Sequence, residues 1–455
     1  MATIPQPPGI PLLGNLFTIT PSNTWACLKK LAEQYGEIFQ ITVLGRTVVF
    51  VASVALAEEL CDQARFRKFV GGPVVEIRAA VHDALFTAFD HEPSWGVAHR
   101  IMAPHLSAAA VRQRGFLEMR DLANELVAKW ERLGPRAAVS PLAELQRLDL
   151  ETTTFTLLGA RLHCLDGPPH PMLQAMEDAT SEAMLRPTRP GCLNLLRRGR
   201  FKRAIRTMRE YADRVVRHRR DNPTGRDDLL AAMLDARDPE TGEKLTDSQV
   251  VDEIVSMPIG SSTAPCLLAT AIFLLLRNPE AVARARQELD AVAPGGRELA
   301  ADDLDRLHYV HAVVRESLRL SFAAPGFNIE PVPSASRAPV QLAGGKYQVA
   351  HDQAIIVVMA GVNRDPAVFD DPLAFRPERM LPDQLAALPD GAKKWFGNGK
   401  RECIGKHHAW QWSVLVLATL LAKVDFAMAD AEYELEQDGW FNYRPVGFMA
   451  NVTVR

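Results

Sequence analysis

Apolar residues recur three or four positions apart over most of the chain between Val54 and Leu320, the spacing that places them on one face of an α-helix. Segments rich in Gly and Pro interrupt this pattern and predict the loops between helices. The interruptions fall at 71–73, 168–169, 187–191, 222–225 and 294–296. The centre of the chain is therefore predicted to be α-helical.

The N-terminal segment combines one helix with a hairpin. Trp25–Tyr35 has helical periodicity and is followed by Gly36, a residue type that often ends helices. Two stretches rich in β-branched residues, Ile38–Val43 and Thr47–Val51, flank a short turn that contains Gly45. We expect these two stretches to pair as a β-hairpin.

The segment after residue 245 predicts the longest helix of the chain. Asp238–Leu245 has the composition of a turn or small hairpin, and the apolar pattern that follows continues to about Arg277. At 3.6 residues per turn, this segment is long enough for a helix of about eight turns.

The last third of the chain mixes strands with one helix. An apolar helix is expected over His408–Ala422, after a coil rich in Pro and Arg at Asp365–Pro382. No repeat or Gly/Ser-rich linker divides the sequence, so we predict one large α+β domain, mainly helical with a small β-rich region, over residues 1–455. The β-like stretches are Val340–Gln341, Ile355–Met359, Tyr433–Leu435 and Phe448–Val454.

Charge and composition exclude some functional classes. The chain has 52 Lys and Arg against 55 Asp and Glu, a formal net charge of −3, which gives no support for binding nucleic acid. Its six cysteines are scattered, as is usual in a reducing cytosol. The longest apolar runs, Ala264–Leu276 and Trp412–Ala422, are shorter than the ~18 residues of a membrane span. We expect a soluble cytoplasmic protein without a transmembrane anchor.

One segment departs from this charge balance. Residues 197–220 contain eleven Lys and Arg against Glu210 and Asp213, a local net charge of +9. Charge runs on long helices usually form a solvated face, and attraction of an anionic substrate is the alternative.

The stretch from Phe396 to Gly405 carries the clearest chemical signal. Cys403 lies in a loop rich in Gly, immediately before an apolar helix, where free backbone N–H groups and the helix dipole favour a thiolate. Gly397, Gly399 and Gly405 allow the backbone to approach a flat and bulky group, and Arg401 can pair with a carboxylate on that group. A haem with its propionates meets these requirements.

The spacing Phe-x-x-Gly-x-Arg-x-Cys-x-Gly over 396–405 resembles that of the cytochrome P450 family, and the similarity extends over nearly the whole chain. Glu316-Ser-Leu-Arg319 resembles the Glu-x-x-Arg helix of that family, and Arg379 in Phe375–Arg379 resembles the arginine that completes an ion-pair triad with it. The resemblance implies a structural role for the triad. It also implies that Cys403 ligates the iron of haem b, beside Phe396.

Trp95-Gly-Val-Ala-His99 is similar to the family's helix that reaches a haem propionate. The indole N–H and the imidazole are donors that suit this role beside Arg401.

Several segments, among them Arg65–Phe69, are most similar to soluble fatty-acid hydroxylases whose haem domain is fused to a flavin reductase. That resemblance implies that Arg46 meets a substrate carboxylate at the channel mouth, although Phe50 replaces the tyrosine that assists it there. It also implies an apolar substrate pocket above the haem. The residues expected to line that pocket are Phe86, Ile259, Ala324 and Phe441.

The expected oxygen-binding groove departs from the family pattern. Gly260 and Thr263 are retained, but Ser262 stands where the family usually has an acid, and Ile259 replaces a small residue. A serine hydroxyl passes a proton along a hydrogen-bonded chain but holds no titratable proton near neutral pH. Poor coupling of reductant to product is therefore expected. Drift in a tolerant groove is the alternative interpretation.

Two prolines in the same segment add to this departure. Pro258 and Pro265 each remove a backbone donor and predict a kink in the helix.

The resemblance implies oxygenation of a hydrophobic small molecule with O2, and with NAD(P)H used through a flavin or iron–sulfur redox partner. Nothing in the chain resembles a flavin or nucleotide site, so the reductase is expected to be separate or on a missing fused domain. Two alternatives stay open. One is a haem-thiolate enzyme that does not hydroxylate, such as a peroxide user, an isomerase or an oxidative coupler; the other is a haem sensor or carrier.

An acidic electron carrier would be attracted by cationic residues around the cysteine loop. The competing explanation is that these cationic residues only keep the protein surface soluble. These residues are Lys393, Lys394, Lys400, Lys406, His407 and His408.

Overall fold

The computed structural model describes residues 2–20, 23–43, 45–189, 191–439 and 441–455. These residues form two compact units, each built from three separate stretches of the chain. The first unit comprises Met1–Val70, Arg315–Cys403 and Gln437–Arg444. The second comprises Gly71–Val314, Ile404–Glu436 and Pro445–Arg455.

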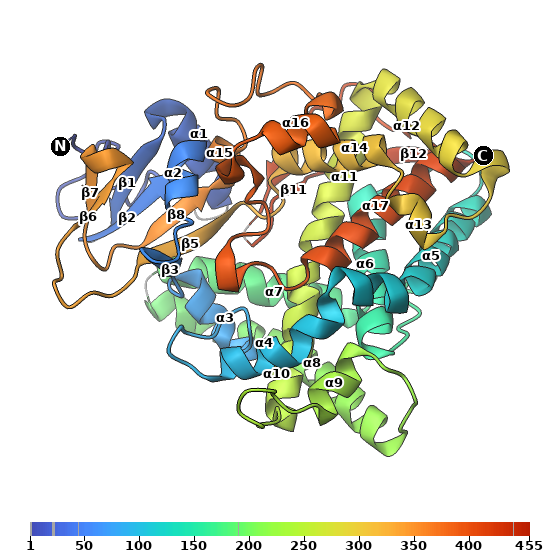
Figure 1. Cartoon of the computed structure of the whole chain (residues 1–455), viewed down its shortest axis with the longest axis horizontal. Helices are drawn as coiled ribbons and strands as arrows, with labels where there is room; N and C mark the ends of the chain where they lie inside the picture. The colour runs from blue at the N-terminus through green and yellow to red at the C-terminus, as the bar shows by residue number, and fades with distance from the viewer. Residues whose placement is uncertain (1, 21–22, 44, 190, 440) are drawn as a thin grey trace. The chain divides into compact units, whose positions relative to one another are not determined.

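The first unit is organised around a five-stranded sheet of order β1-β2-β8-β5-β3. β1 and β2 form the predicted antiparallel hairpin, β8 lies parallel to β2, and β5 pairs antiparallel with both β8 and β3. Figure 1 shows these N-terminal strands in blue beside the later strands in orange. The strands are β1 (Ile38–Val43), β2 (Arg46–Val51), β3 (Phe66–Lys68), β5 (Gly326–Pro331) and β8 (Ile355–Val358).

Short helices and a second hairpin complete this unit. The helix α1 ends as predicted at Gly36, whose φ of 80° is favoured by glycine. The other elements are α1 (Thr24–Tyr35), α2 (Val54–Glu59), α15 (Met359–Val362), α16 (Pro382–Ala387), β6 (Val340–Leu342), β7 (Tyr347–Val349) and β10 (Gln437–Asp438), which pairs with β11 (Arg444–Pro445). The boundary between the units falls within helix α14 (His308–Ser321), whose residues up to Val314 belong to the second unit and those from Arg315 to the first.

The second unit is mainly helical. Its core contains α6, α11 and α17, whose residues are mostly buried. The strands β4 (Ala137–Val139), β12 (Ala450–Val454) and β9 (Val424–Met428) form one antiparallel sheet. The helices are α3 (Pro73–Val81), α4 (Ser94–Met102), α5 (Ala108–Leu133), α6 (Pro141–Leu158), α7 (Pro171–Leu185), α8 (Gly191–Asp221), α9 (Leu229–Asp235), α10 (Asp247–Ser261), α11 (Thr263–Arg277), α12 (Pro279–Val292), α13 (Ala301–Leu304) and α17 (Lys406–Lys423).

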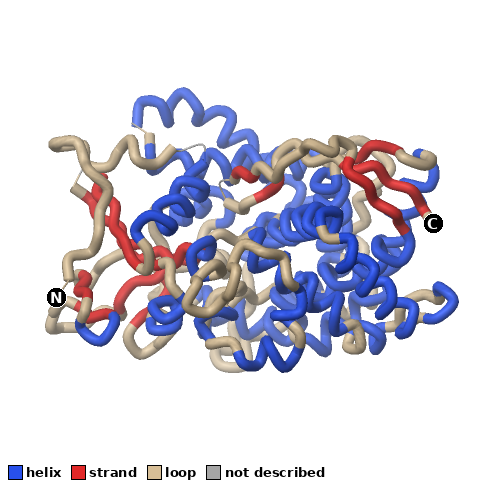
Figure 2. Tube along the Cα trace, turned by 90° about the horizontal axis from the view of Figure 1, so that it is seen from above, coloured by secondary structure: helices blue, strands red, loops and turns tan. Residues whose placement is uncertain are grey.

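The predicted fold class is confirmed: helices form most of the trace in Figure 2, and strands occupy a few short places. The expected strand at Tyr433–Leu435 was wrong, because that stretch pairs with no strand among the described residues. The neighbouring strands are β9, directly after α17, and β10, two residues after Leu435. The short strands β3 and β4 were not expected, since three residues are too few to show alternation.

The prediction of the longest helix was also wrong. The segment that ends at Arg277 is two helices, α10 and α11, separated at Ser262. Pro265 has no N–H to donate to the Ser261 carbonyl, so the backbone bonding pattern is broken at this point. Among the described residues the longest helix is α8, with 31 residues.

The stretch Asp247–Arg277 that contains both helices is long and apolar enough to cross a membrane by length and composition. Within the chain, however, 67% of its most apolar window is buried, as in a core helix.

Candidate functional site

The loop that carries Cys403 is held in shape by its own backbone. The Cys403 N–H donates to the Phe396 carbonyl at 2.8 Å, and the Glu402 N–H donates to the Gly399 carbonyl at 3.0 Å. Gly397 and Gly399 have φ values of 81° and 62°, in the left-handed region that favours glycine. The Cys403 side chain is exposed at the end of this loop, three residues before α17.

The residues after α2 anchor the same loop. The Asn398 side chain donates to the Cys61 carbonyl at 2.7 Å, and the Lys400 N–H donates to Gln63 Oε1 at 2.9 Å. A Cβ added at Gly399 would overlap the Gln63 side chain. Gly399 is therefore required both by its backbone angle and by this close approach.

Two cations act on the cysteine loop. Arg401 lies two residues before Cys403, and Lys68, at the end of β3, interacts electrostatically with both residues. Removal of the Lys68 ammonium from bulk water, with a smaller repulsion from Arg401, lowers its pKa to about 7. Sequence reasoning did not assign Lys68 to the site, although the segment around it belongs to the resemblance.

The second unit holds the other expected haem contacts. Trp95 and His99 lie one turn apart on α4 and stack, with ring centroids 4.9 Å apart and planes inclined by 23°. Arg100 of the same helix binds Asp238 through two hydrogen bonds of 2.6 and 2.7 Å. Asp238 is the first residue of the predicted turn, so these two hydrogen bonds tie α4 to that turn.

The expected oxygen-binding groove is at the break between α10 and α11. The Ser262 hydroxyl donates to the Ile259 carbonyl at 2.7 Å, and the Thr263 hydroxyl donates to the Gly260 carbonyl at 3.3 Å. Gly260 is exposed, and a Cβ there would meet no described atom within 4 Å apart from its chain neighbours and the backbone of its own helix. Open space therefore lies beside Gly260.

Sequence reasoning missed an acid at this break. Ser261 Oγ lies 2.6 Å from Asp149 Oδ2, on α6, and Asp149 is buried. Burial raises the pKa of Asp149 to about 8. The only signal in the sequence was an acid between two leucines of an apolar helix, Leu148 and Leu150.

The expected pocket residues belong to different units. Phe86 and Ile259 lie in the second unit, and Ala324, Phe441 and Arg46 lie in the first. Ile259 is buried, Phe86 and Phe441 are partly exposed, and Arg46 is exposed at the start of β2. The pocket that these residues were expected to line stays a prediction.

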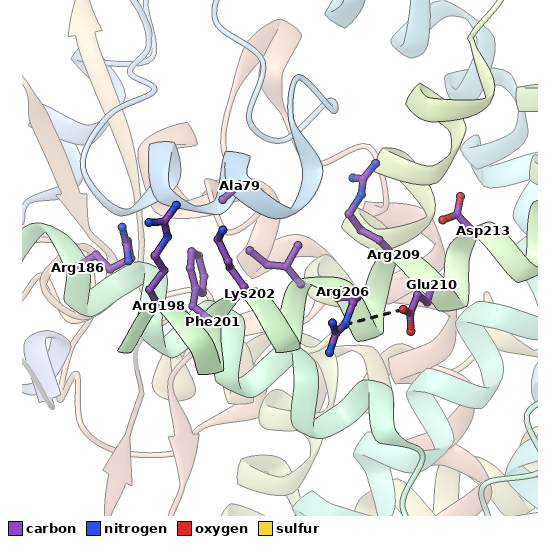
Figure 3. A pocket seen from close by; sticks show the side chains of 10 residues that line it. Ala79, Arg186, Arg198, Phe201, Lys202, Arg206, Arg209, Glu210 and Asp213 are labelled. Atoms are coloured by element: carbon purple, nitrogen blue, oxygen red, sulfur yellow. Dashed lines mark ion pairs between the residues drawn. The ribbon is translucent and has the colours of Figure 1, made fainter. Parts of the chain in front are cut away.

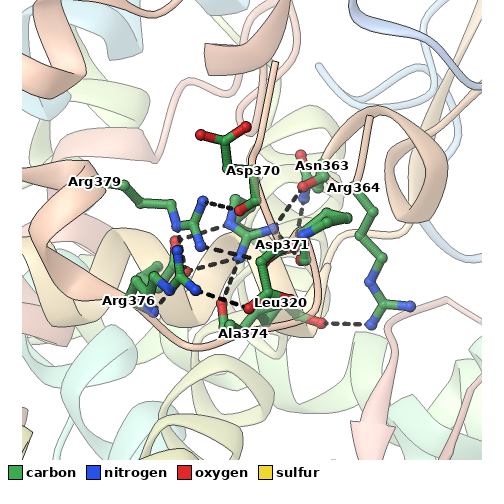
Figure 4. A network of polar contacts seen from close by, with 11 residues as sticks. Leu320, Asn363, Arg364, Asp370, Asp371, Ala374, Arg376 and Arg379 are labelled. Atoms are coloured by element: carbon green, nitrogen blue, oxygen red, sulfur yellow. Dashed lines mark hydrogen bonds and ion pairs between the residues drawn. The ribbon is translucent and has the colours of Figure 1, made fainter. Parts of the chain in front are cut away.

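Glu316, Arg319 and Arg379 form the predicted network within the first unit. The Arg319 guanidinium donates two hydrogen bonds to Glu316, of 2.8 and 2.7 Å, and Arg379 Nε lies 3.1 Å from Glu316 Oε1. The Arg376 N–H donates to the same carboxylate at 3.0 Å. Figure 4 shows Arg376 and Arg379 converging on this network.

The basic run predicted at 197–220 lies on α8. Five of its cations form ion pairs, among them Arg209, which binds Asp252. Arg198 and Lys202 form neither an ion pair nor a hydrogen bond with any described residue, and both extend toward α3 in Figure 3. They line a cavity of about 580 Å³, together with Phe201 and Ile205.

The expected cationic surface around the cysteine loop needs one correction. His408 is buried, and its Nε2 lies 3.0 Å from the Thr156 hydroxyl. Burial lowers the pKa of His408 to about 4, so this side chain is neutral near pH 7 and adds no surface charge. Because α17 is almost wholly apolar, its sequence shows no periodicity from which the burial of His408 was predictable.

Comparison with known proteins supports the resemblance. The model of the cytochrome P450 family matches residues 4–450. A self-sufficient cytochrome P450 monooxygenase of Phanerodontia chrysosporium is 37% identical over the whole of this chain and 43% of its own length. Bifunctional cytochrome P450/NADPH–P450 reductases of Acremonium egyptiacum and Fusarium oxysporum are 36% and 38% identical over 99% of this chain and 43% and 42% of theirs.

The chain thus spans less than half the length of the curated relatives that it matches. The family match, by contrast, covers nearly the whole chain and includes the Cys403 loop and the Glu316 network. The chain belongs to the cytochrome P450 family, whose cofactor is haem.

Proposed function

We propose that residues 1–455 act as one haem-binding domain of a monooxygenase, which inserts one oxygen atom of O2 into a C–H or C=C bond of a hydrophobic small molecule. The observation that carries the proposal is the exposed Cys403 thiol on a loop shaped by Gly397 and Gly399. A haem with a thiolate ligand, when bound, supplies the activation of O2 that this chemistry requires.

The residues present fit a haem. Cys403 is the proposed iron ligand. Gly397 leaves room in the same loop, because among the described residues, its two chain neighbours apart, a Cβ there would contact the Glu402 Cα alone, at 4.0 Å. Lys68 interacts electrostatically with Cys403, and Lys68 and Arg401 are the proposed partners of the two propionates, whose negative charges would favour the protonated form of Lys68. Phe396 and Gly405 flank the sulfur along the chain.

Trp95 and His99 are the proposed N–H donors to a propionate. Their stacking restricts both rings to one orientation, so that little side-chain entropy is lost when they bind.

A partner reductase is part of the proposal. The two bifunctional relatives are named as P450/NADPH–P450 reductases, and this supports delivery of electrons from NADPH through a flavoprotein. We propose the same source of electrons for this chain, either from a separate protein or from a fused domain.

The substrate is proposed to be hydrophobic. Phe86, Ile259, Ala324 and Phe441 supply apolar surface, and exposed Arg46 supplies a cation for an acidic end group. Phe50 packs on Phe39, with ring centroids 5.1 Å apart, and its phenyl ring carries no hydrogen-bond donor for an acidic end group. A carboxylate would depend on Arg46 alone.

A second candidate is a haem-thiolate enzyme that takes peroxide, couples or isomerises its substrate. Ser262 favours it, because its hydroxyl donates to a backbone carbonyl and carries no titratable proton for oxygen reduction. Thr263 and the complete Cys403 loop favour turnover over a sensor or carrier.

One experiment separates these functions. Ligands are first selected from fatty acids and aromatic polyketides by the optical spin-state change of the holoenzyme. Product is then measured with NADPH and a surrogate reductase, and separately with hydrogen peroxide alone. Product that depends on NADPH supports the monooxygenase. Product formed only with peroxide supports the second candidate, and ligand binding without product under either condition contradicts both.

A further inference from the structure

The break between α10 and α11 is contacted by a buried acid from another helix. Asp149 is 5% exposed and hydrogen-bonds with Ser261, two residues before Thr263. No Lys, Arg or His among the described residues pairs with it. A buried carboxyl without a cation is held in its neutral form, because the ionised form loses its hydration without compensation.

A structural explanation does not account for Asp149, as comparison with Glu151 on the same helix shows. Glu151 is buried too, but its two oxygens accept the N–H groups of Leu162 and Cys164, both at 2.9 Å, and it pairs with Arg161. Among the described residues, Asp149 caps no backbone group and hydrogen-bonds with Ser261 alone. Its burial therefore costs stability without fixing a loop.

A neighbouring hydroxyl extends the polar patch. Thr153 lies one turn from Asp149 on the same face of α6, and its buried Oγ1 has no hydrogen-bonding partner among the described residues. Buried hydroxyls are normally satisfied, so this atom is available to a water molecule near the carboxyl. Thr153 therefore adds a second polar group to the face of α6 on which Asp149 meets Ser261.

Several other acids on the elements packed against α6 are engaged elsewhere. Asp252 binds Arg209 and His82, and Glu253 accepts the Leu85 N–H. Four further acids of this region are paired, Glu118 with Arg226, Glu144 with Lys129, Glu182 with Arg189 and Asp228 with Arg219. His408, which reaches α6 from α17, is neutral.

We propose that Asp149, acting through Ser261, is the acid that delivers protons to the groove at Thr263 in place of the acid missing at position 262. The inference rests on the proposed oxygen chemistry. In each transfer the carboxyl gives its proton to Ser261 Oγ, while the hydroxyl proton of Ser261 passes to water in the groove. The Asp149 carboxylate then regains a proton from water, so that charge and atoms balance.

Asp149 is better placed for this role than the two acids of α10, Asp252 and Glu253. Asp252 and Glu253 lie about three turns before Thr263 along α10, and each is bound to other groups. Asp149 is far from Thr263 in sequence but is one hydrogen bond from the break. A neutral acid beside a hydroxyl can exchange donor and acceptor roles with it, as proton transfer requires.

The test compares Asp149→Asn and Ser261→Ala with the matched control Glu253→Gln, which removes another buried acid without touching Ser261. Infrared difference spectra of the holoenzyme are recorded at pH 6.5, about 1.5 units below the pKa of Asp149, where they report the protonated carboxyl directly. We expect one carbonyl band to vanish in Asp149→Asn and to shift in Ser261→Ala. Glu253→Gln removes a different band.

The second readout is oxygen consumption by the holoenzyme with excess reductase and NADPH, which needs no identified substrate. Loss of a general acid slows the reaction, and we expect at least about a tenfold decrease for Asp149→Asn and a larger solvent deuterium isotope effect. Ser261→Ala changes both in the same direction, and Glu253→Gln changes neither. An unchanged rate in Asp149→Asn, or no band assigned to Asp149, overturns the inference. Failure of the wild type to consume oxygen overturns the proposed function instead, and the infrared assignment is still measurable.

Discussion

Replacing Glu316 by Ala should destabilise the protein more than loss of almost any other ion-pairing side chain. Arg319 is fully buried and donates to Glu316, and also to the carbonyls of Asn363, Pro372 and Ala374 at 2.9, 2.7 and 3.1 Å. Without Glu316 its charge stays buried without a counter-ion. Breaking a buried pair in this way costs about 3–5 kcal/mol, a large fraction of the 5–15 kcal/mol by which a typical domain is stable.

The assay is the urea midpoint of unfolding, with the dependence on urea compared between variants. Asp302→Ala is the matched control, because Asp302 pairs with Arg112 at 2.7 Å but is 96% exposed, and such pairs contribute about 0–1 kcal/mol. Replacing Glu316 by Leu and Arg319 by Met together should recover only part of the loss, since three buried carbonyls then lack donors. A cost for Glu316→Ala equal to that of Asp302→Ala refutes the reasoning.

Three further predictions follow from the described contacts. The pKa of Asp149 is raised from 3.8 to about 8, so the folded state holds a proton that the unfolded state releases, and wild-type stability falls as pH rises from 4 to 8. Asp149→Asn should remove up to about 3 kcal/mol of the decrease in the free energy of unfolding between pH 5 and pH 7. Profiles of stability against pH that run parallel in the variant and the wild type would contradict this. Gly399→Ala should lower the free energy of unfolding by about 1–3 kcal/mol and lower the haem content. Gly36 has a similar φ but open space around it, so Gly36→Ala should leave the haem content unchanged. Equal haem loss in both variants would show that the close approach at Gly399 is unimportant. Replacing Arg198 and Lys202 together by Gln should weaken binding of dodecanoate more at low salt than at high salt, and an unchanged affinity at low salt would exclude these cations from substrate attraction.

Local sequence patterns predicted the parts of the site that depend on local geometry. Glu316 and Arg319 are three residues apart on one helix, so their pairing needs no knowledge of the fold. The shape of the Cys403 loop was likewise indicated by Gly397 and Gly399, which adopt positive φ values. The N-terminal hairpin followed from β-branched runs, and the end of α1 and several of the breaks between later helices followed from Gly and Pro.

Contacts between distant segments were not predictable in this way. The bond between Asp149 and Ser261 joins residues 112 positions apart, and neither position shows a pattern that selects the other. The burial of His408 depends on which side of an almost wholly apolar helix faces α6. The prolines predicted a kink near Ser262, but not that the helix is interrupted there by one residue.

The spectrum of the reduced carbon monoxide complex tests the central claim, that Cys403 is the thiolate ligand of a haem. We predict the red-shifted Soret band of thiolate ligation for the wild type and its loss in Cys403→Ser. Cys61→Ser is the control, because Cys61 lies on the segment that anchors the same loop yet contributes only its backbone carbonyl, to Asn398, and this variant should keep the band. A thiolate band that persists in Cys403→Ser would contradict the assignment of the site.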